Sequence, residues 1–200
     1  MHCTGVILAG GRARRFDGRP KGLEVVGGRR IIDRVAEALR ATTDDLLLIA
    51  NDPDASAWLP GVRTMGDLRQ GEGSLGGLHA ALSHAAGAVL VVAWDMPFVS
   101  TPLLARLRAL GEHGHDAAVA ESESRRGVEP VCAWYGPGAL DAITRALDRD
   151  DRRMIAFLDD VRVARLPLEE VRRFGDPRTL FLNVNTHDDL IEANRIAGTL

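Results

Sequence analysis

Residues 4–21 read TGVILAGGRARRFDGRPK, and this stretch decides the fold. Thr4–Leu8 is a short apolar run that stops at Gly10-Gly11, which is typical of a buried strand entering a turn. Glycines let backbone N–H groups approach an anion closely, and consecutive N–H groups form an anion-binding nest. The stretch therefore predicts a strand and a phosphate-binding loop with five cationic side chains: Arg12, Arg14, Arg15, Arg19 and Lys21.

The alternative interpretation of this loop is an ordinary solvated turn that is rich in arginine. Two well-known phosphate motifs do not fit it. A Walker A loop needs a Gly-Lys pair, and the chain has none. A dinucleotide fingerprint needs G-x-G-x-x-G, a spacing that Gly10-Gly11-Arg12-Ala13 breaks. Lys21, however, is the only lysine among 25 basic residues, and its compact ammonium differs chemically from a forked guanidinium.

The first half of the chain alternates between strand and helix patterns. Leu46–Ala50 and Val89–Ala93 are further continuous apolar runs, which indicate strands covered on both faces. Apolar residues at helical spacing lie between them, and Ser100 is a candidate N-cap for a third helix. We therefore predict an α/β fold with a doubly wound, mostly parallel sheet flanked by helices, in the Rossmann-like manner. The predicted helical stretches are residues 31–39, 75–82 and 103–110.

The second half is less regular, and no linker or internal repeat divides the chain. We predict one domain over residues 1–200, with a regular half over about 1–110 and a less regular half over about 111–200. Thr186 begins a capping-box-like start to a last helix. The further predicted strands are Ala117–Ala120, Val131–Tyr135, Val161–Leu166 and Leu180–Val184, and the further predicted helices are Ala139–Leu147 and Ile155–Leu158.

Composition excludes several classes of protein. The net charge of -3 gives no reason to expect nucleic acid or an anionic membrane as a partner. No apolar run approaches the roughly 20 residues of a membrane-spanning helix. Cys3 and Cys132 form no C-x-x-C pair, so we expect a reducing cytoplasm. The histidines form no zinc pattern, and no G-x-S-x-G elbow is present.

The opening loop resembles the signature of a known enzyme family. Leu-Ala-Gly-Gly, then Arg15, then Lys21 follow the form L-A-G-G-x-[SGA]-x-R and a later lysine. This is similar to the nucleotidyltransferases, and in detail to the MobA-type molybdenum cofactor guanylyltransferases. Four further segments match in the same order, so the resemblance covers nearly the whole chain. It implies that the nucleotide contacts Leu8, Ala9, Gly10, Gly11 and Lys21, and that Lys21 and Arg15 act in catalysis.

Carboxylates and amides after the predicted strands carry the next part of the resemblance. Asp95, in Asp-Met-Pro after Val89–Ala93, resembles the magnesium ligand of the family, and a hard oxygen ligand suits Mg²⁺ shared with phosphates. Asp67 occupies the position that reads guanine, since a carboxylate can accept both N1–H and N2–H of that base. Asn51 matches an asparagine that contacts the nucleotide. Taken alone, Asp67 and Asn51 are equally typical of turns.

The acceptor side of the resemblance departs more from the family pattern. Glu129 stands where relatives often have histidine before the proline. Asn183 and Asn185 match a late N-x-N-T element, which is also a common helix start. Pro20 replaces a frequent aspartate before the lysine, and Ser74 replaces the proline of a G-P-L-A-G segment that opens a helix beside the nucleotide.

The resemblance implies transfer of GMP from GTP to molybdenum-bearing molybdopterin, with Mg²⁺ as cofactor and pyrophosphate as leaving group. It also implies a nucleotide-binding half over about 1–110, an acceptor-binding half over about 111–200, and partners among molybdoenzyme chaperones or other cofactor-biosynthesis proteins. The acceptor phosphate is already ionised, so catalysis needs positioning and charge stabilisation rather than an enzyme nucleophile. Alternatives are a sibling enzyme that uses CTP or a sugar phosphate, a non-catalytic GTP-binding adaptor, and a NAD-dependent enzyme, against which the missing G-x-G-x-x-G argues.

Overall fold

The computed structural model describes residues 1–10 and 20–199. Within these residues one sheet has seven strands in the order β5-β4-β1-β6-β8-β7-β9, and a separate hairpin joins β2 to β3. The strands are β1 Cys3–Leu8, β2 Val25–Val26, β3 Arg29–Arg30, β4 Asp45–Ile49, β5 Arg63–Met65, β6 Ala88–Ala93, β7 Ala117–Glu121, β8 Val128–Tyr135 and β9 Val163–Leu166.

The sheet is mostly parallel, which confirms the predicted fold class. β5, β4, β1 and β6 run parallel to one another, β8 is antiparallel to both β6 and β7, and β9 is parallel to β7. The chain leaves β1 on one side to form β4 and β5, and it then crosses to the other side of β1 to form β6. The carboxyl ends of β4, β1 and β6 therefore meet at a topological switch point, where open α/β sheets bind ligands.

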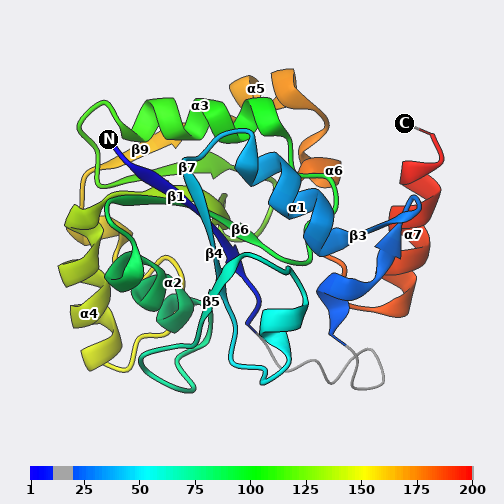
Figure 1. Ribbon diagram of the computed structural model, residues 1–200. Coiled ribbons are helices and arrows are strands. Elements are labelled where there is room, and N and C mark those ends of the chain that lie inside the picture. Colours follow the sequence, from blue (N-terminus) through cyan, green and yellow to red (C-terminus); the bar gives the residue numbers. More distant parts are fainter. Residues whose placement is uncertain (11–19, 200) are drawn as a thin grey trace.

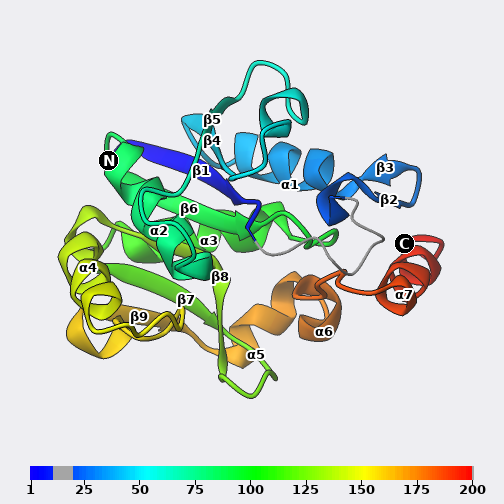
Figure 2. The ribbon, with the colours of Figure 1, turned by 90° about the horizontal axis from the view of Figure 1, so that it is seen from below.

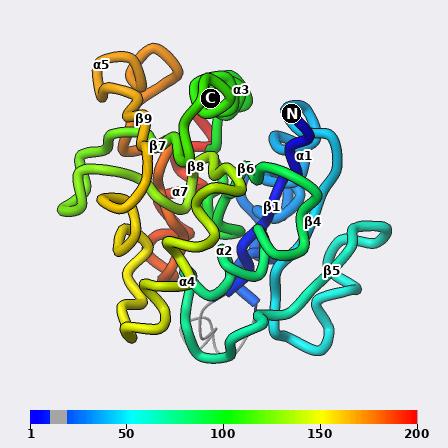
Figure 3. The backbone as a smooth tube through the Cα atoms, turned by 90° about the vertical axis from the view of Figure 1, so that its left-hand side faces the viewer, coloured from blue at the N-terminus to red at the C-terminus, as the bar shows by residue number. Residues whose placement is uncertain are grey.

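Helices cover both faces of this sheet (Figures 1 and 3). Leu90 and Val92 of β6 pack into the core that includes α1 and α3, whereas Val89 and Val91 pack into the core that includes α2 and α4. This alternation follows from the two-residue period of a strand, and it needs apolar side chains at every position. The helices are α1 Ile31–Arg40, α2 Gly73–His84, α3 Thr101–Gly111, α4 Leu140–Asp148, α5 Leu168–Val171, α6 Pro177–Leu180 and α7 His187–Ala197.

Two predicted helix starts are present as hydrogen-bonded caps. The Ser100 hydroxyl accepts a hydrogen bond from the Leu103 N–H at the start of α3. Thr186 and Asp189 form a reciprocal capping box at the start of α7. Both caps satisfy N–H groups that the first turn of a helix leaves without a partner.

Other local predictions were wrong. Leu180–Val184 is not a strand, because Asp176 caps the short helix α6 and the chain then runs as an irregular segment towards α7. Ile155–Leu158 forms turns that lead into a 3₁₀ turn at Leu158–Asp160 rather than a helix. In both places the sequence has a short apolar run, and such runs occur in irregular segments that pack on a core as well as in strands and helices.

The C-terminal segment passes across the carboxyl ends of the strands, at the edge of the sheet where the switch point lies. Figure 2 shows the orange-to-red chain passing from α5 through α6 to α7, from the region of β7 to the β2–β3 hairpin. On the way the Val184 N–H donates a hydrogen bond to the Asp95 carbonyl at 2.9 Å. In the described part of the chain, none of the helices has the length and apolar character needed to cross a membrane.

Candidate active site

Three predicted side chains meet beyond the carboxyl end of β6. The Lys21 ammonium donates hydrogen bonds to the Asp95 carboxylate and, at 2.9 Å, to Asn185 Oδ1. The Lys21 side chain is 18% exposed and the Asp95 side chain 6%. Because the Asp95 carboxylate is buried and the Lys21 ammonium partly buried, removal of the lysine would leave a buried charge uncompensated.

Each member of this cluster comes from a different part of the chain. Lys21 begins the 3₁₀ turn η1 (Lys21–Leu23), and Asp95 follows the last strand residue of β6 by two positions. Asn185 lies before α7, where its backbone N–H donates to the capping carboxylate of Asp189 at 2.9 Å. The capping box that starts α7 therefore also fixes the backbone that carries Asn185.

Asp95 has free capacity for a further ligand. Its Oδ2 pairs with Lys21, whereas its Oδ1 is buried and has no hydrogen-bond partner among the described residues. A buried carboxylate oxygen without a donor carries a desolvation cost that a bound cation would remove. A single carboxylate oxygen beside phosphate oxygens is also how Mg²⁺ is commonly held. The donor set at Asp95 thus fits the magnesium ion that the sequence predicts.

A first cavity of about 560 Å³ lies at the carboxyl ends of β1 and β4. Ala9 and Gly10 line it directly after β1, and Pro20 and Trp94 line it as the chain neighbours of Lys21 and Asp95. The Ala9 N–H donates to the Ile49 carbonyl at 2.9 Å, which continues the β1–β4 pairing into the loop and keeps the cavity floor in register. Leu8 is the buried last residue of β1 beneath this floor.

Asn51 and Asp67 form a hydrogen-bonded pair in the wall of this first cavity. The Asn51 amide donates to Asp67 Oδ2 at 2.6 Å, and Asn51 Oδ1 accepts from the Asp67 backbone N–H at 2.8 Å. Their positions follow β4 and β5, which are neighbours in the sheet. Asn51 thus orients the carboxylate, while the other oxygen, Asp67 Oδ1, forms no hydrogen bond to the described residues.

The N-terminus of α2 lies beside the same cavity. Gly71 and Gly73 line it, and the side chain of the N-cap residue, Glu72, makes no capping hydrogen bond to the described residues. The first N–H groups of α2 are therefore available to an anion, and the helix dipole favours one there. Ser74, which stands where relatives have proline, does not prevent the helix from starting at Gly73.

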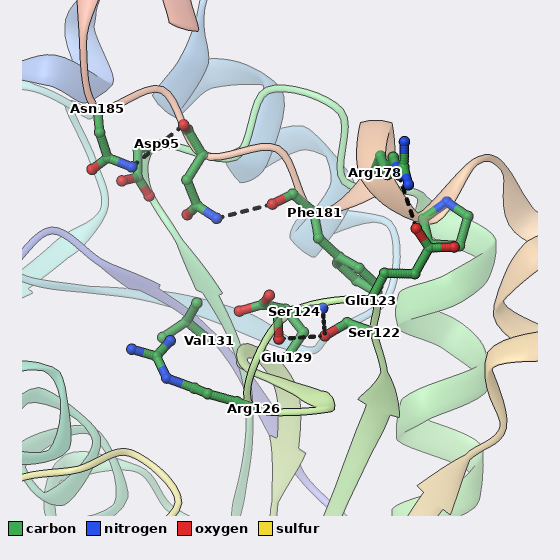
Figure 4. Close-up of a pocket in the computed structure, with 12 residues that line it drawn as sticks. Asp95, Ser122, Glu123, Ser124, Arg126, Glu129, Val131, Arg178, Phe181 and Asn185 are labelled. Carbon is green, nitrogen blue, oxygen red and sulfur yellow. Dashed lines mark hydrogen bonds and ion pairs between the residues drawn. The ribbon is translucent and has the colours of Figure 1, made fainter.

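A second cavity of about 600 Å³ adjoins the cluster on its other side (Figure 4). Asp95, Asn183 and Asn185 line one end of it, and Glu129 lines it from β8. Glu129 is 7% exposed, and burial raises its pKa to about 7, which the nearby Arg126 guanidinium partly opposes. The Asn183 amide donates to the Phe181 carbonyl at 2.9 Å, which orients its side chain at the cavity.

Almost all of the predicted site residues that the structure describes lie at these two cavities. Lys21 lies between the two cavities, where it is hydrogen-bonded to Asp95. The residues at the first cavity are Ala9, Gly10, Asn51 and Asp67, and those at the second are Glu129, Asn183 and Asn185. Gly11 and the catalytic candidate Arg15 lie outside the described residues, as do the other three arginines of the opening loop.

Sequence reasoning missed two groups of cavity-lining residues. Trp58 and Trp94 line the first cavity, and Ser122, Arg126 and Phe181 line the second. The position of Trp94 directly before Asp95 was an available signal. Nothing in the sequence around Trp58 or Phe181 separates them from core residues, because both belong to apolar clusters.

Comparison with known proteins agrees with this geometry. The family model described as "MobA-like NTP transferase domain" matches residues 5–163. The probable molybdenum cofactor guanylyltransferase of Pelotomaculum thermopropionicum is 39% identical over 98% of this chain and 94% of its own. The molybdenum cofactor guanylyltransferase of Desulfosudis oleivorans is 33% identical over 95% of this chain and 93% of its own. The crystal structure of molybdopterin-guanine dinucleotide biosynthesis protein A from Archaeoglobus fulgidus superposes with a TM-score of 0.83. The two chains are 31% identical, and the match covers 98% of this chain and 100% of that one.

Proposed function

Since the chain belongs to the MobA-like NTP transferase family, we propose that it transfers GMP from GTP to molybdenum-bearing molybdopterin and releases pyrophosphate. The observation that carries this proposal is the Lys21–Asp95–Asn185 cluster, which joins a nucleotide-sized cavity to a second cavity. An enzyme that couples two phosphorylated substrates needs such a junction, because both reacting phosphates must meet at one charged point.

GTP fits the first cavity in a defined direction. The Asp67 carboxylate accepts the paired N–H donors of guanine, and cytosine and uracil offer no such pair. Gly10 and the uncapped start of α2 place backbone N–H groups near the phosphates, and Lys21 adds a positive charge. The base therefore lies at the β4–β5 end and the triphosphate at the β1–β6 end.

The acceptor occupies the second cavity with its terminal phosphate towards Asp95 and Asn185. An oxygen of that phosphate attacks the α-phosphorus of GTP, a new P–O bond forms, and the bond to the β-phosphate oxygen breaks, so that pyrophosphate carries away the electron pair. Lys21 neutralises charge on the reacting oxygens, and Asn185 keeps its ammonium in place. No proton needs to leave the nucleophile, because the phosphate is ionised near neutral pH.

We include Mg²⁺ in this proposal because Asp95 Oδ1 is buried without a partner among the described residues. Asp95 would hold the ion, which would supply charge stabilisation on the phosphates. Glu129, Asn183 and Asn185 remain proposed acceptor contacts, and Arg15 remains a proposed catalytic residue. Interaction with cofactor-biosynthesis proteins or chaperones, and a cytoplasmic location, also remain proposals.

The test is pyrophosphate release with Mg²⁺ and molybdopterin carrying molybdenum, measured separately with GTP, CTP, ATP and UTP. We expect turnover with GTP alone and a guanine dinucleotide product by mass spectrometry. Turnover with CTP would keep the mechanism and refute the role of Asp67. Tight GTP binding without turnover, with the acceptor shown to bind, would refute the enzymatic proposal and favour a GTP-binding adaptor.

A further inference from the structure

Trp94 connects the two ends of the nucleotide cavity. Trp94 is 3% exposed, and its indole ring stacks on Trp58 with ring centroids 5.0 Å apart and an angle of 22° between the planes. Trp58 directly follows the 3₁₀ turn η2 (Ala55–Ala57), which follows Asn51 along the chain. Trp94 therefore contacts the loop that carries Asn51, one member of the Asn51–Asp67 pair.

The Trp94 ring also lies against the turn that carries Lys21. A Cβ atom built on Gly22 would come within 2.4 Å of the ring, so the ring rests on the bare α-carbon of Gly22. Gly22 is buried within η1, directly after Lys21. Because the backbone of Gly22 does not have the positive φ that requires glycine, the close approach of Trp94 is the reason that a larger residue does not fit.

The backbone of Trp94 is also fixed on the sheet. Its N–H donates to the Leu8 carbonyl at 3.1 Å, which extends the β1–β6 pairing by one residue. The Trp94 side chain is therefore held between the base end of the cavity and the turn that carries the lysine. Trp94 also directly precedes Asp95 in the chain. Close packing of this kind transmits small displacements, since protein interiors are nearly incompressible.

We propose that Trp94 is a positioning residue, which holds the Lys21 turn through Gly22 and aligns the phosphate end of the nucleotide site with its base end. The inference rests on the proposed nucleotide site but not on the identity of the acceptor. Two variants separate the contacts. Gly22→Ala disturbs the contact with η1, and Trp94→Leu removes both this contact and the stacking on Trp58.

The lone lysine supplies a direct readout of the position of Lys21. With limiting acetyl N-hydroxysulfosuccinimide ester, only Lys21 and the Met1 amine can form acetylated amines, and peptide mass spectrometry measures their ratio. In the native protein Lys21 is held by Asp95 and Asn185. We expect the Lys21-to-Met1 acetylation ratio to rise about fivefold or more in Gly22→Ala and Trp94→Leu, because a displaced ammonium loses both partners, and to stay within about twofold in Trp94→Phe, which keeps a ring at this position.

Trp134 provides a matched control, because it is also buried and its ring also rests on a glycine, Gly111 in α3. The variant Trp134→Leu should lower thermal stability at least as much as Trp94→Leu and leave the acetylation ratio within about twofold, since it opens a core cavity away from the site. An equal rise in Trp134→Leu would identify general loosening and overturn the proposal. An unchanged ratio in folded Gly22→Ala and Trp94→Leu would also overturn it.

Kinetics give a second test once turnover is measured. We expect Gly22→Ala to lower kcat about tenfold to a hundredfold with the KM for GTP changed less than about threefold, because a displacement near 1 Å costs about that much. Trp94→Leu should lower kcat and raise that KM, and adding Gly22→Ala to it should cause little further loss, because the two changes disturb one contact. Additive losses would overturn the proposal. The acetylation ratio needs no substrate, so a failed assay of activity leaves this inference independently testable.

Discussion

Replacement of Asp95 by asparagine tests the charge at the centre of the site. Asparagine keeps the shape of aspartate, so one oxygen can still accept from Lys21, while an amide nitrogen or a neutral oxygen replaces the unpartnered Oδ1. The proposed magnesium ligand is lost without a cavity. Loss of one preorganised charge lowers kcat by about 10²–10³, which corresponds to roughly 3–4 kcal/mol of transition-state stabilisation.

Pyrophosphate release over a series of Mg²⁺ concentrations measures the effect of Asp95→Asn. We expect kcat to fall by about 10²–10³ and the Mg²⁺ concentration for half-maximal rate to rise at least about tenfold, because a carboxylate ligand is lost. The KM for GTP should change little, because Asp67 lies at the other end of the cavity. Asp188→Asn, in the exposed first turn of α7, is the matched control. A kcat within tenfold of wild type with the same Mg²⁺ dependence would refute the reasoning.

Three further predictions concern other parts of the molecule. Asp67→Asn should lower kcat/KM for GTP by about 10² or more, because one of two paired acceptors becomes a donor; unchanged preference for GTP over CTP would contradict this. Burial raises the pKa of Glu129 from 4.5 to about 7, so its stabilisation of the folded state is complete below pH 4.5 and is lost as the pH rises towards 7. Glu129→Gln should therefore remove on the order of 3 kcal/mol of pH dependence between pH 4.5 and 8 in urea unfolding, and parallel curves for both proteins would contradict this. Tyr135→Phe should lower the free energy of unfolding by about 1–2 kcal/mol, because the Tyr135 hydroxyl donates to the buried Pro130 carbonyl at 2.7 Å; equal urea midpoints would contradict this.

Much of the fold could be predicted from the sequence because its central strands are buried on both faces. Runs such as Val89–Ala93 have no polar positions, and this pattern is typical of a parallel strand in a sheet between two helical layers. The antiparallel direction of β8 also has a signal in the sequence, which the prediction of a mostly parallel sheet does not use. Residues 122–127 are too few for the crossover of about a dozen or more residues that a parallel pair needs, so β7 and β8 must pair antiparallel.

Part of the candidate site could likewise be predicted from the sequence, and part could not. Asp95, Asn51 and the glycine loop follow predicted strands, and the carboxyl ends of neighbouring parallel strands must meet at one edge. The role of Trp94 could not be predicted, since an isolated tryptophan after a strand is most often a core residue. Its significance depends on the contact with Gly22, which lies 72 residues earlier and approaches only in the folded chain.

The hydrogen bond from Lys21 to Asn185 joins residues that are 164 positions apart. Residues 5–163, which match the family model, contain strands β4, β5, β6, β7 and β8 in full but neither Asn183 nor Asn185. A polypeptide is synthesised from its N-terminus, so the strands that carry the nucleotide cavity are made before Asn185. The second hydrogen-bond partner of the lysine follows only after those strands. A chain that stopped before Asn185 would therefore contain the residues that line the nucleotide cavity but would lack one of the two groups that hold the Lys21 ammonium.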